Sequence, residues 1–152
     1  ARELMPVQPE KTGGDPHLQI AAKEHPVISL SAGRITVQAT VVRAGGDLCI
    51  VLTGGDRPHI GTVTLSVARP SLADAARTSA TTSVLNLTGH KDGEAAQYLS
   101  ERLAAALGTT VVVTGGIHVD DIQPGEIRTV LDLVDRLTLA LVDLLTADRK
   151  TP

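Results

Sequence analysis

Aromatic residues are almost absent from this sequence. They make up 1% of its 152 residues, and Tyr98 is accompanied by no tryptophan or phenylalanine. A protein that stacks nucleic-acid bases on aromatic rings is therefore disfavoured. The formal net charge of -3 points the same way, since a nucleic-acid partner would require a basic face. The hydrophobic core must instead be built from valine, leucine, isoleucine and alanine.

Cysteine and long apolar runs are equally scarce. Cys49 is the single cysteine, so no disulfide can form within the chain, and the apolar run around it predicts an inert core residue. No apolar stretch is long enough to cross a bilayer, and the first residues lack the basic and apolar regions of a signal peptide. These absences predict a cytoplasmic protein with no membrane partner.

The length fits one domain preceded by a short arm. Residues 1–16 are rich in proline and glycine, which is typical of a flexible N-terminal arm. Residues 17–149 are expected to form a single α+β domain with a real core. Its first strand is predicted at 17–24, and Pro26 ends it or marks a sheet edge.

Hydrophobic periodicity changes once along this domain. Up to residue 87, apolar residues alternate with polar ones, which is the period of strands, and from Ala95 onward they recur at helical spacing. The first helix ends before Gly108, and the second begins at Pro124 with a wide apolar stripe. We therefore predict an α+β fold, a mainly antiparallel sheet with two helices in the C-terminal half. The clearest predicted strands cover residues 35–41, 48–52, 63–67, 78–87 and 109–114.

Three loops share one pattern. They read TGGDRPHIG at 53–61, TGHKD at 88–92 and TGGIHVDD at 114–121. In each, a threonine and a glycine end an apolar run, and a histidine follows within a few residues. Glycine lets a backbone approach a ligand closely, while histidine and aspartate can bind a metal, donate to a phosphate or move a proton. The repetition predicts one shared site.

The first two loops each have a structural and a functional interpretation. In the structural interpretation of the first loop, Gly54 and Gly55 make a simple turn and Asp56 and Arg57 form a solvated pair. His59 at a strand start is more than a turn requires. His90 and Lys91 precede a helix, where a phosphate would gain unpaired N–H groups and a positive charge. Most helix starts bind nothing, so an ordinary helix cap remains the alternative.

The third loop combines a histidine with two aspartates. His118 and Asp120 lie two residues apart on an extended segment, so they face the same side and can pair or ligate a metal together. As a metal motif the spacing is weak, because neither HExxH nor CxxC is present. In an alternative interpretation, Asp121 caps the helix that begins at Pro124.

The strand at 78–87 is unusually rich in hydroxyl groups, with Thr81, Thr82 and Ser83 at its centre. Threonine favours strands on its own account, so a solvated sheet face explains the run. Rows of hydroxyls also suit ligand phosphates and ribityl chains. Both interpretations stay open at this point.

Taken together, three stretches resemble the prenylated-flavin chaperone family, which is LpdD-like and includes the small D subunit associated with gallate decarboxylase. The stretches are GGDRPHIG, RTSATTSVLNLTGHKD and VVVTGGIHVDDI, and the resemblance runs from about Ile35 to Leu145. It implies a protein that binds prenylated FMN and carries or protects it for a UbiD-type decarboxylase, without a decarboxylase site of its own. It also implies a fold similar to that of proteasome assembly chaperones, and a homodimer.

The resemblance also implies which residues contact the cofactor. With so few aromatics, the isoalloxazine would pack on valine, leucine, isoleucine or glycine backbone, and a divalent cation could bridge the phosphate to His118 or Asp120. Two alternatives are a metal-assisted enzyme that uses His59, His118 and Asp120, and a ligand-free assembly chaperone or accessory subunit of a decarboxylase. The candidate cofactor contacts are Gly55, Asp56, His59, Thr81, Thr82, Ser83, His90, Lys91, His118, Asp120 and Asp121.

Overall fold

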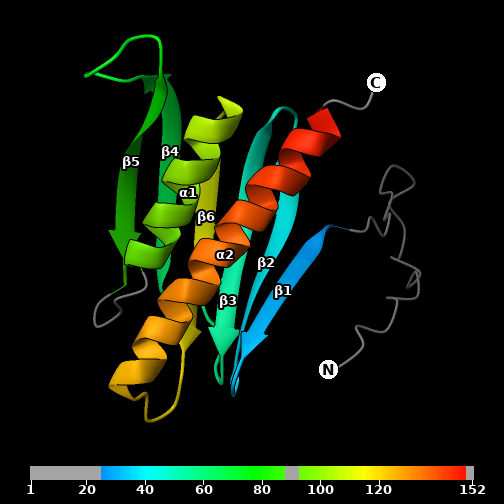
Figure 1. The fold of residues 1–152 in the computed structure, drawn as a ribbon, viewed down its shortest axis with the longest axis vertical. Coiled ribbons are helices and arrows are strands. Elements are labelled where there is room, and N and C mark those ends of the chain that lie inside the picture. Colours follow the sequence, from blue (N-terminus) through cyan, green and yellow to red (C-terminus); the bar gives the residue numbers. More distant parts are fainter. Residues whose placement is uncertain (1–24, 88–92, 150–152) are drawn as a thin grey trace, which may run out of the picture.

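The protein folds into two layers, a six-stranded sheet and a pair of helices on one of its faces (Figure 1). The structure is a computed structural model that describes residues 25–87 and 93–149. The strands are β1 (Val27–Ala32), β2 (Ile35–Ala44), β3 (Asp47–Gly55), β4 (Thr62–Pro70), β5 (Thr78–Asn86) and β6 (Val111–His118), and the helices are α1 (Gly93–Leu107) and α2 (Pro124–Arg149).

The strand order β1-β2-β3-β6-β4-β5 is antiparallel at every junction except β3 with β6. The predicted α+β fold with a mainly antiparallel sheet is therefore confirmed. Helix α1 packs on β4, β5 and β6, while α2 packs on β1 and β2. The opposite face of the sheet, named here the open face, is covered by no described helix (Figure 1).

The parallel pair brings distant loops to one edge of the sheet. Gly55 at the end of β3 is the registered partner of His118 at the end of β6. Strand β4 is antiparallel to β6, so β4 begins at this edge, and β5 ends there, with Asn86 opposite Thr62. We name this side the loop edge. It carries the β3–β4 loop, the end of β5 and the β6–α2 loop.

The core lies between the sheet and the helices, as the periodicity requires. On β2, Ile35 and Val37 are buried beneath α2, whose stripe buries Leu137 and Leu141 completely. Each such side chain contributes about 1.5–3 kcal/mol when removed from water. Alternation on the strands therefore fixes which residues remain on the open face.

Beneath α1, strand β4 buries hydroxyl side chains rather than apolar ones. The hydroxyls of Thr64 and Ser66 both donate to Ser100 Oγ on α1, at 3.1 and 2.8 Å. Ser66 also shares a 2.6 Å hydrogen bond with Thr82 on β5. Within the described residues, every buried side-chain polar atom has a partner. The network therefore ties α1 to β4 and β5 without leaving an unpaired buried group.

The structure differs from the sequence predictions at the first strand and at Cys49, and some predictions concern residues that it does not describe. The arm at 1–16 and the strand expected at 17–24 lie outside the described residues. A strand that was not predicted forms directly after Pro26, because alternate apolar residues of β1 pack against the core. Cys49 is not core: it is half-buried on the open face, since its neighbours on β3 are the ones that point toward the helices.

Candidate functional site

The first and third loops of the sequence pattern meet at the loop edge. The amide of Asp56 donates to the carbonyl oxygen of His118 at 2.7 Å. The amide of Leu87, at the end of β5, donates to Gly61 at 2.9 Å, so the chain enters the second loop from the same place. Residues 88–92, which include His90 and Lys91, lie outside the described residues.

Glycine at position 55 makes this close approach possible. Gly55 has a φ of 74°, a conformation that side chains disfavour. A Cβ atom at this position would also collide with the carbonyl oxygen of His118. The glycine predicted as a candidate contact therefore serves the packing of one loop against the other.

His59 lies back over the sheet. Its Nδ1 is 2.9 Å from the carbonyl oxygen of Arg57, and because a carbonyl only accepts, Nδ1 carries the hydrogen. A Cβ built on Gly116 would come 2.5 Å from His59 Nε2. The glycine on β6 thus makes room for the imidazole, which is placed on the open face at the loop edge.

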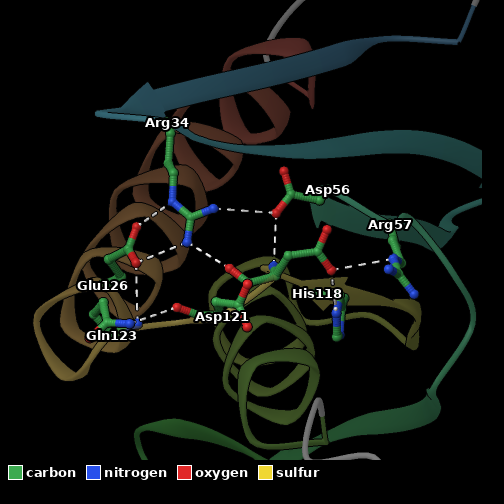
Figure 2. A network of polar contacts seen from close by, with 8 residues as sticks. Arg34, Asp56, Arg57, His118, Asp121, Gln123 and Glu126 are labelled. Atoms are coloured by element: carbon green, nitrogen blue, oxygen red, sulfur yellow. Dashed lines mark hydrogen bonds and ion pairs between the residues drawn. The ribbon is translucent and has the colours of Figure 1, made fainter.

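Asp120 shares one carboxylate oxygen between two basic side chains. His118 Nε2 lies 3.1 Å from Asp120 Oδ1, which confirms the pairing predicted from their spacing. Arg57 Nε lies 3.3 Å from the same oxygen (Figure 2). Arg57 and Asp56 therefore do not form an isolated surface pair. The first loop instead contributes a cation to the third.

Arg34, in the turn between β1 and β2, reaches both loops (Figure 2). Its Nε and Nη2 donate to the two carboxylate oxygens of Glu126 at 2.7 and 3.0 Å, and Nη2 also donates to the carbonyl oxygen of Asp120 at 2.7 Å. Its Nη1 lies 3.6 Å from Asp56 Oδ2. The hydrogen bond from Arg34 is the main cause that lowers the pKa of Glu126.

Carboxylates of this network also hold the backbone of the β6–α2 loop. Asp56 Oδ2 accepts the amide of Asp120 at 2.8 Å, and Glu126 Oε1 accepts the amide of Gln123 at 3.1 Å. The second bond caps α2. Asp121 adopts a φ of 51°, and its carbonyl accepts from Gln123 Nε2. The cap therefore comes from Glu126, and the alternative interpretation in which Asp121 caps this helix is wrong.

The hydroxyls of β5 divide between the two faces of the sheet. Thr81 and Ser83 pair with Val67 and Leu65 in the ladder and share their exposed, open face. Arg69 Nε donates to Thr81 Oγ1 at 2.6 Å. Thr82 points the other way and bonds to Ser66 beneath α1. A ligand on the open face would therefore meet Thr81 and Ser83.

The open face carries an apolar patch beside these hydroxyls. Its exposed apolar side chains are Val63, Leu65, Val67 and Leu85, named here the apolar shelf. Leu85 is 73% exposed and stands directly across from Val63. The shelf begins next to His59, since Val63 is paired with the β6 residue two positions before Gly116.

A groove of about 400 Å³ lies on the opposite, helical side, between α1 and α2. Leu131 and Val134 line its apolar part, and Glu94 and Asp135 are its charged lining residues among those described. The hydroxyl of Tyr98 donates to Asp135, which raises the pKa of Tyr98. The two carboxylates would repel a phosphate, so the groove is less suited to a nucleotide than the open face.

Residues 25–87 and 93–149 contain neither a cluster of metal ligands nor a membrane-spanning helix. In these ranges, no group of three or more histidine, cysteine, aspartate or glutamate side chains is arranged to hold a metal ion. The bridging cation and the metal-assisted enzyme therefore gain no support there. None of the described helices is long and apolar enough to span a bilayer.

Sequence reasoning missed Arg34 and Glu126. Arg34 is a lone arginine in a turn, and its partner Glu126 is 92 residues further along the chain. A capping-box glutamate at the third position of the last helix was a usable signal for Glu126. Arg34 offered none, because only the register of β1 with β2 brings it to the loop edge.

Comparisons with known proteins agree with the loop pattern. A family model described as the prenylated flavin chaperone LpdD-like domain matches residues 31–146. Protein LpdD of Lactiplantibacillus plantarum is 31% identical over 113 residues, which are 73% of this chain and 78% of that protein. A solved chaperone complex for yeast 20S proteasome assembly aligns with a TM-score of 0.45 and 14% identity, over 82% of this chain and 95% of that one. The chain belongs to the LpdD-like family of prenylated flavin chaperones.

Proposed function

We propose that the protein binds prenylated FMN without transforming it, and supplies or protects it for a UbiD-type decarboxylase in the cytoplasm. One observation carries the proposal. The family match spans both described loops, and these loops bring His59 and His118 to the same edge of the sheet. Membership of a chaperone family favours a binding role over catalysis.

The open face offers the ring system of a flavin an aliphatic surface to pack on. Flavin rings often stack on aromatic side chains, but the chain's single tyrosine lies on the helical side. The apolar shelf provides aliphatic surface instead, with the imidazole of His59 at its start. We place the isoalloxazine on Val63 and Leu65. An aliphatic contact of this kind releases its ligand more readily than an aromatic clamp, which suits a carrier.

Polar groups beside the shelf suit the remainder of the cofactor. The hydroxyl of Ser83 lies across from Leu65, in reach of a ribityl chain that extends from the ring. Arg57 and the pair formed by His118 and Asp120 add polar contacts at the loop edge. We assign the phosphate to Lys91, as its place before a helix suggests. Gly55, Asp56 and Asp121 shape the loops, and we omit Thr82 because it faces α1.

Retention of the cofactor on a gel-filtration column tests the proposal. The protein is mixed anaerobically with prenylated FMN and then passed over the column at micromolar concentration. We expect the cofactor's absorbance to elute with the protein. Elution of the colour as free cofactor would contradict binding and favour the ligand-free assembly chaperone. Elemental analysis of the same sample addresses the metal-assisted enzyme, which requires a bound transition metal.

Matched variants locate the site. His59→Ala and Lys91→Ala should each weaken retention, and a lost charge-assisted phosphate bond should cost about 1.5–3 kcal/mol. His25→Ala is the control, because exposed His25 precedes β1 at the opposite edge of the sheet. Equal retention by all three variants would place the cofactor elsewhere.

The likeness to the family also motivates a homodimer and a decarboxylase partner. A second copy placed over the open face would bury the apolar shelf of both chains and enclose the cofactor. Apolar surface left exposed on a sheet is typical of an interface. We propose that the UbiD-type large subunit competes with this arrangement when it takes the cofactor.

A further inference from the structure

We propose that Arg34 is a positioning residue, which holds the β6–α2 loop in the shape that the cofactor site needs. The inference rests on the proposed function, since the shape of this loop matters to the cofactor only if the cofactor binds beside it. No motif in the sequence pointed to Arg34. Its role follows from where its guanidinium lies among three segments that are far apart along the chain.

One guanidinium joins these three segments. It donates to Glu126 at the start of α2 through two nitrogens, and to the carbonyl oxygen of Asp120 in the β6–α2 loop. Its third nitrogen faces Asp56 in the β3–β4 loop at 3.6 Å (Figure 2). A planar fork with several fixed donors can make these contacts at once, whereas a lysine ammonium is a single point charge.

Both peptide groups of Asp120 are held as a result. Its carbonyl oxygen accepts from Arg34 at 2.7 Å, and its amide donates to Asp56 Oδ2 at 2.8 Å. With the peptide groups on both sides of the Cα atom held, the direction of the Cα–Cβ bond of Asp120 is fixed too. This is why one carboxylate oxygen faces both His118 and Arg57.

Removing the guanidinium would act on the loop in two ways. The carbonyl of Asp120 would lose its donor, and the carboxylates of Asp56 and Glu126 would lose the cation between them. Repulsion between these carboxylates would then favour a displaced loop. His118 would lose its fixed partner, and the cofactor would meet a less ordered loop edge.

The effect on global stability should nevertheless be small. The side chain of Arg34 is 48% exposed, and exposed ion pairs contribute little to the free energy of unfolding. A local change in the loop with little change in melting temperature therefore distinguishes positioning from general stabilisation.

The test compares three variants of the full chain. Arg34→Gln removes the guanidinium. Glu126→Gln removes the paired charge but keeps an amide oxygen that can accept the Gln123 amide, so the cap of α2 is preserved. Arg43→Gln is the matched control, because Arg43 is about as exposed as Arg34 and pairs with Asp148 at 2.8 Å, away from the loop edge.

Three measurements are made on each variant. Amide hydrogen exchange follows the Asp120 amide, and NMR follows the side-chain signals of the His118 imidazole. The third is the rate at which prenylated FMN dissociates. In Arg34→Gln and Glu126→Gln, we expect exchange at Asp120 and cofactor dissociation to be about tenfold faster, with shifted His118 signals. Arg43→Gln should match the unsubstituted protein in all three.

The outcomes separate this inference from the proposed function. If the unsubstituted protein retains the cofactor but Arg34→Gln behaves like Arg43→Gln, the inference is wrong and the proposed function stands. If the unsubstituted protein does not bind the cofactor, the proposed function is wrong, and with it the part of the inference that concerns the cofactor. In that case, unchanged exchange and unchanged His118 signals would also overturn the positioning of the loop, whereas changes in both would support it.

Discussion

The imidazole of His59 lies over Gly116, the β6 residue that faces it on the open side of the sheet. The distance from His59 Nε2 to the place of a Cβ atom on Gly116 is 2.5 Å. The imidazole can therefore occupy this position only because residue 116 has no side chain. This contact ties the first loop to the third and motivates the first prediction.

Gly116→Ala should displace His59 and weaken cofactor retention while the protein stays folded. The added methyl group would meet a side-chain ring that can move away, not the backbone. Gel filtration of the protein mixed with prenylated FMN measures retention, and circular dichroism checks the fold. The matched control is Gly46→Ala, because a Cβ there meets nothing within 4 Å. Full retention by Gly116→Ala would mean that the position of His59 does not matter for binding.

Two neighbouring hydroxyls of β5 should behave differently when removed. Thr82→Val should lower the free energy of unfolding by about 1 kcal/mol, because the hydroxyl that bonds Ser66 is lost from beneath α1. Ser83→Ala should leave stability unchanged and weaken cofactor retention, since Ser83 faces the open side. Urea unfolding and gel filtration measure the two quantities. A loss of retention with Thr82→Val alone would place the ligand on the helical face.

The ion pair of Glu126 with Arg34 should add a small contribution to stability that is lost in acid. The pKa of Glu126 lies below the usual 4.5, mainly because of the hydrogen bond from Arg34. A group whose pKa is lowered by folding adds stability above its unfolded pKa, and this stability is lost as the pH falls through the folded value. Urea unfolding between about pH 6 and about pH 3 should thus show a shallower loss for Glu126→Gln than for the unsubstituted protein. Asp132→Asn, which removes a longer pair with Arg136, is the control and should leave the slope unchanged.

Charge removal at two places should reveal how the cofactor lies on the open face. We expect Lys91→Gln to reduce affinity for prenylated FMN about tenfold or more, because it removes a charge-assisted phosphate contact. Arg69→Gln should have little effect, since Arg69 lies at the end of β4 far from the loop edge and is bonded to Thr81. Fluorescence or absorbance titration measures both affinities. A large loss of affinity with Arg69→Gln and little loss with Lys91→Gln would contradict this prediction. The cofactor would then lie in the opposite orientation, with its phosphate at Arg69 and its ring at the loop edge.

Leu65→Lys should convert the proposed homodimer into a monomer. Leu65 lies in the apolar shelf and is 40% exposed in the single chain, so a second copy over the open face would bury it. Leu139→Lys is the control, because Leu139 is 57% exposed on α2 and lies on the opposite side of the molecule. Light scattering coupled to gel filtration measures the mass. Loss of the dimer with Leu139→Lys instead would move the interface to the helices.

Much of the fold was accessible from the sequence because its signals are local. Alternation on β2 and β4, the helical stripe of α2 and the glycine after α1 depend on neighbours along the chain. The strand after Pro26 was not predicted, because Pro26 was interpreted as the end of an earlier strand or as the mark of a sheet edge; β1, which follows it, is an edge strand. The exposure of Cys49 was missed because an apolar run does not reveal that only one face of the sheet is covered.

The candidate site was accessible only in part. The repeated loop pattern predicted that His59 and His118 act together, and the pairing of His118 with Asp120 followed from their spacing. The sequence did not indicate that Thr82 faces α1, because the two apolar residues that follow the hydroxyls, Val84 and Leu85, lie on opposite faces of the strand. The role of Arg34 could not be predicted from the sequence, since its partners are distant along the chain.

The sequence by itself determined most of the secondary structure, the family and the chemical character of the loops. These depend on residue types at short spacings, which the chain carries whether folded or not. Only the tertiary structure decided that the loops share one edge, because the parallel pairing of β3 with β6 aligns Gly55 with His118. The same pairing and the placement of both helices on one side left the opposite face open. Strand register depends on residues far apart along the chain, and here it brings the first and third loops together into one candidate site.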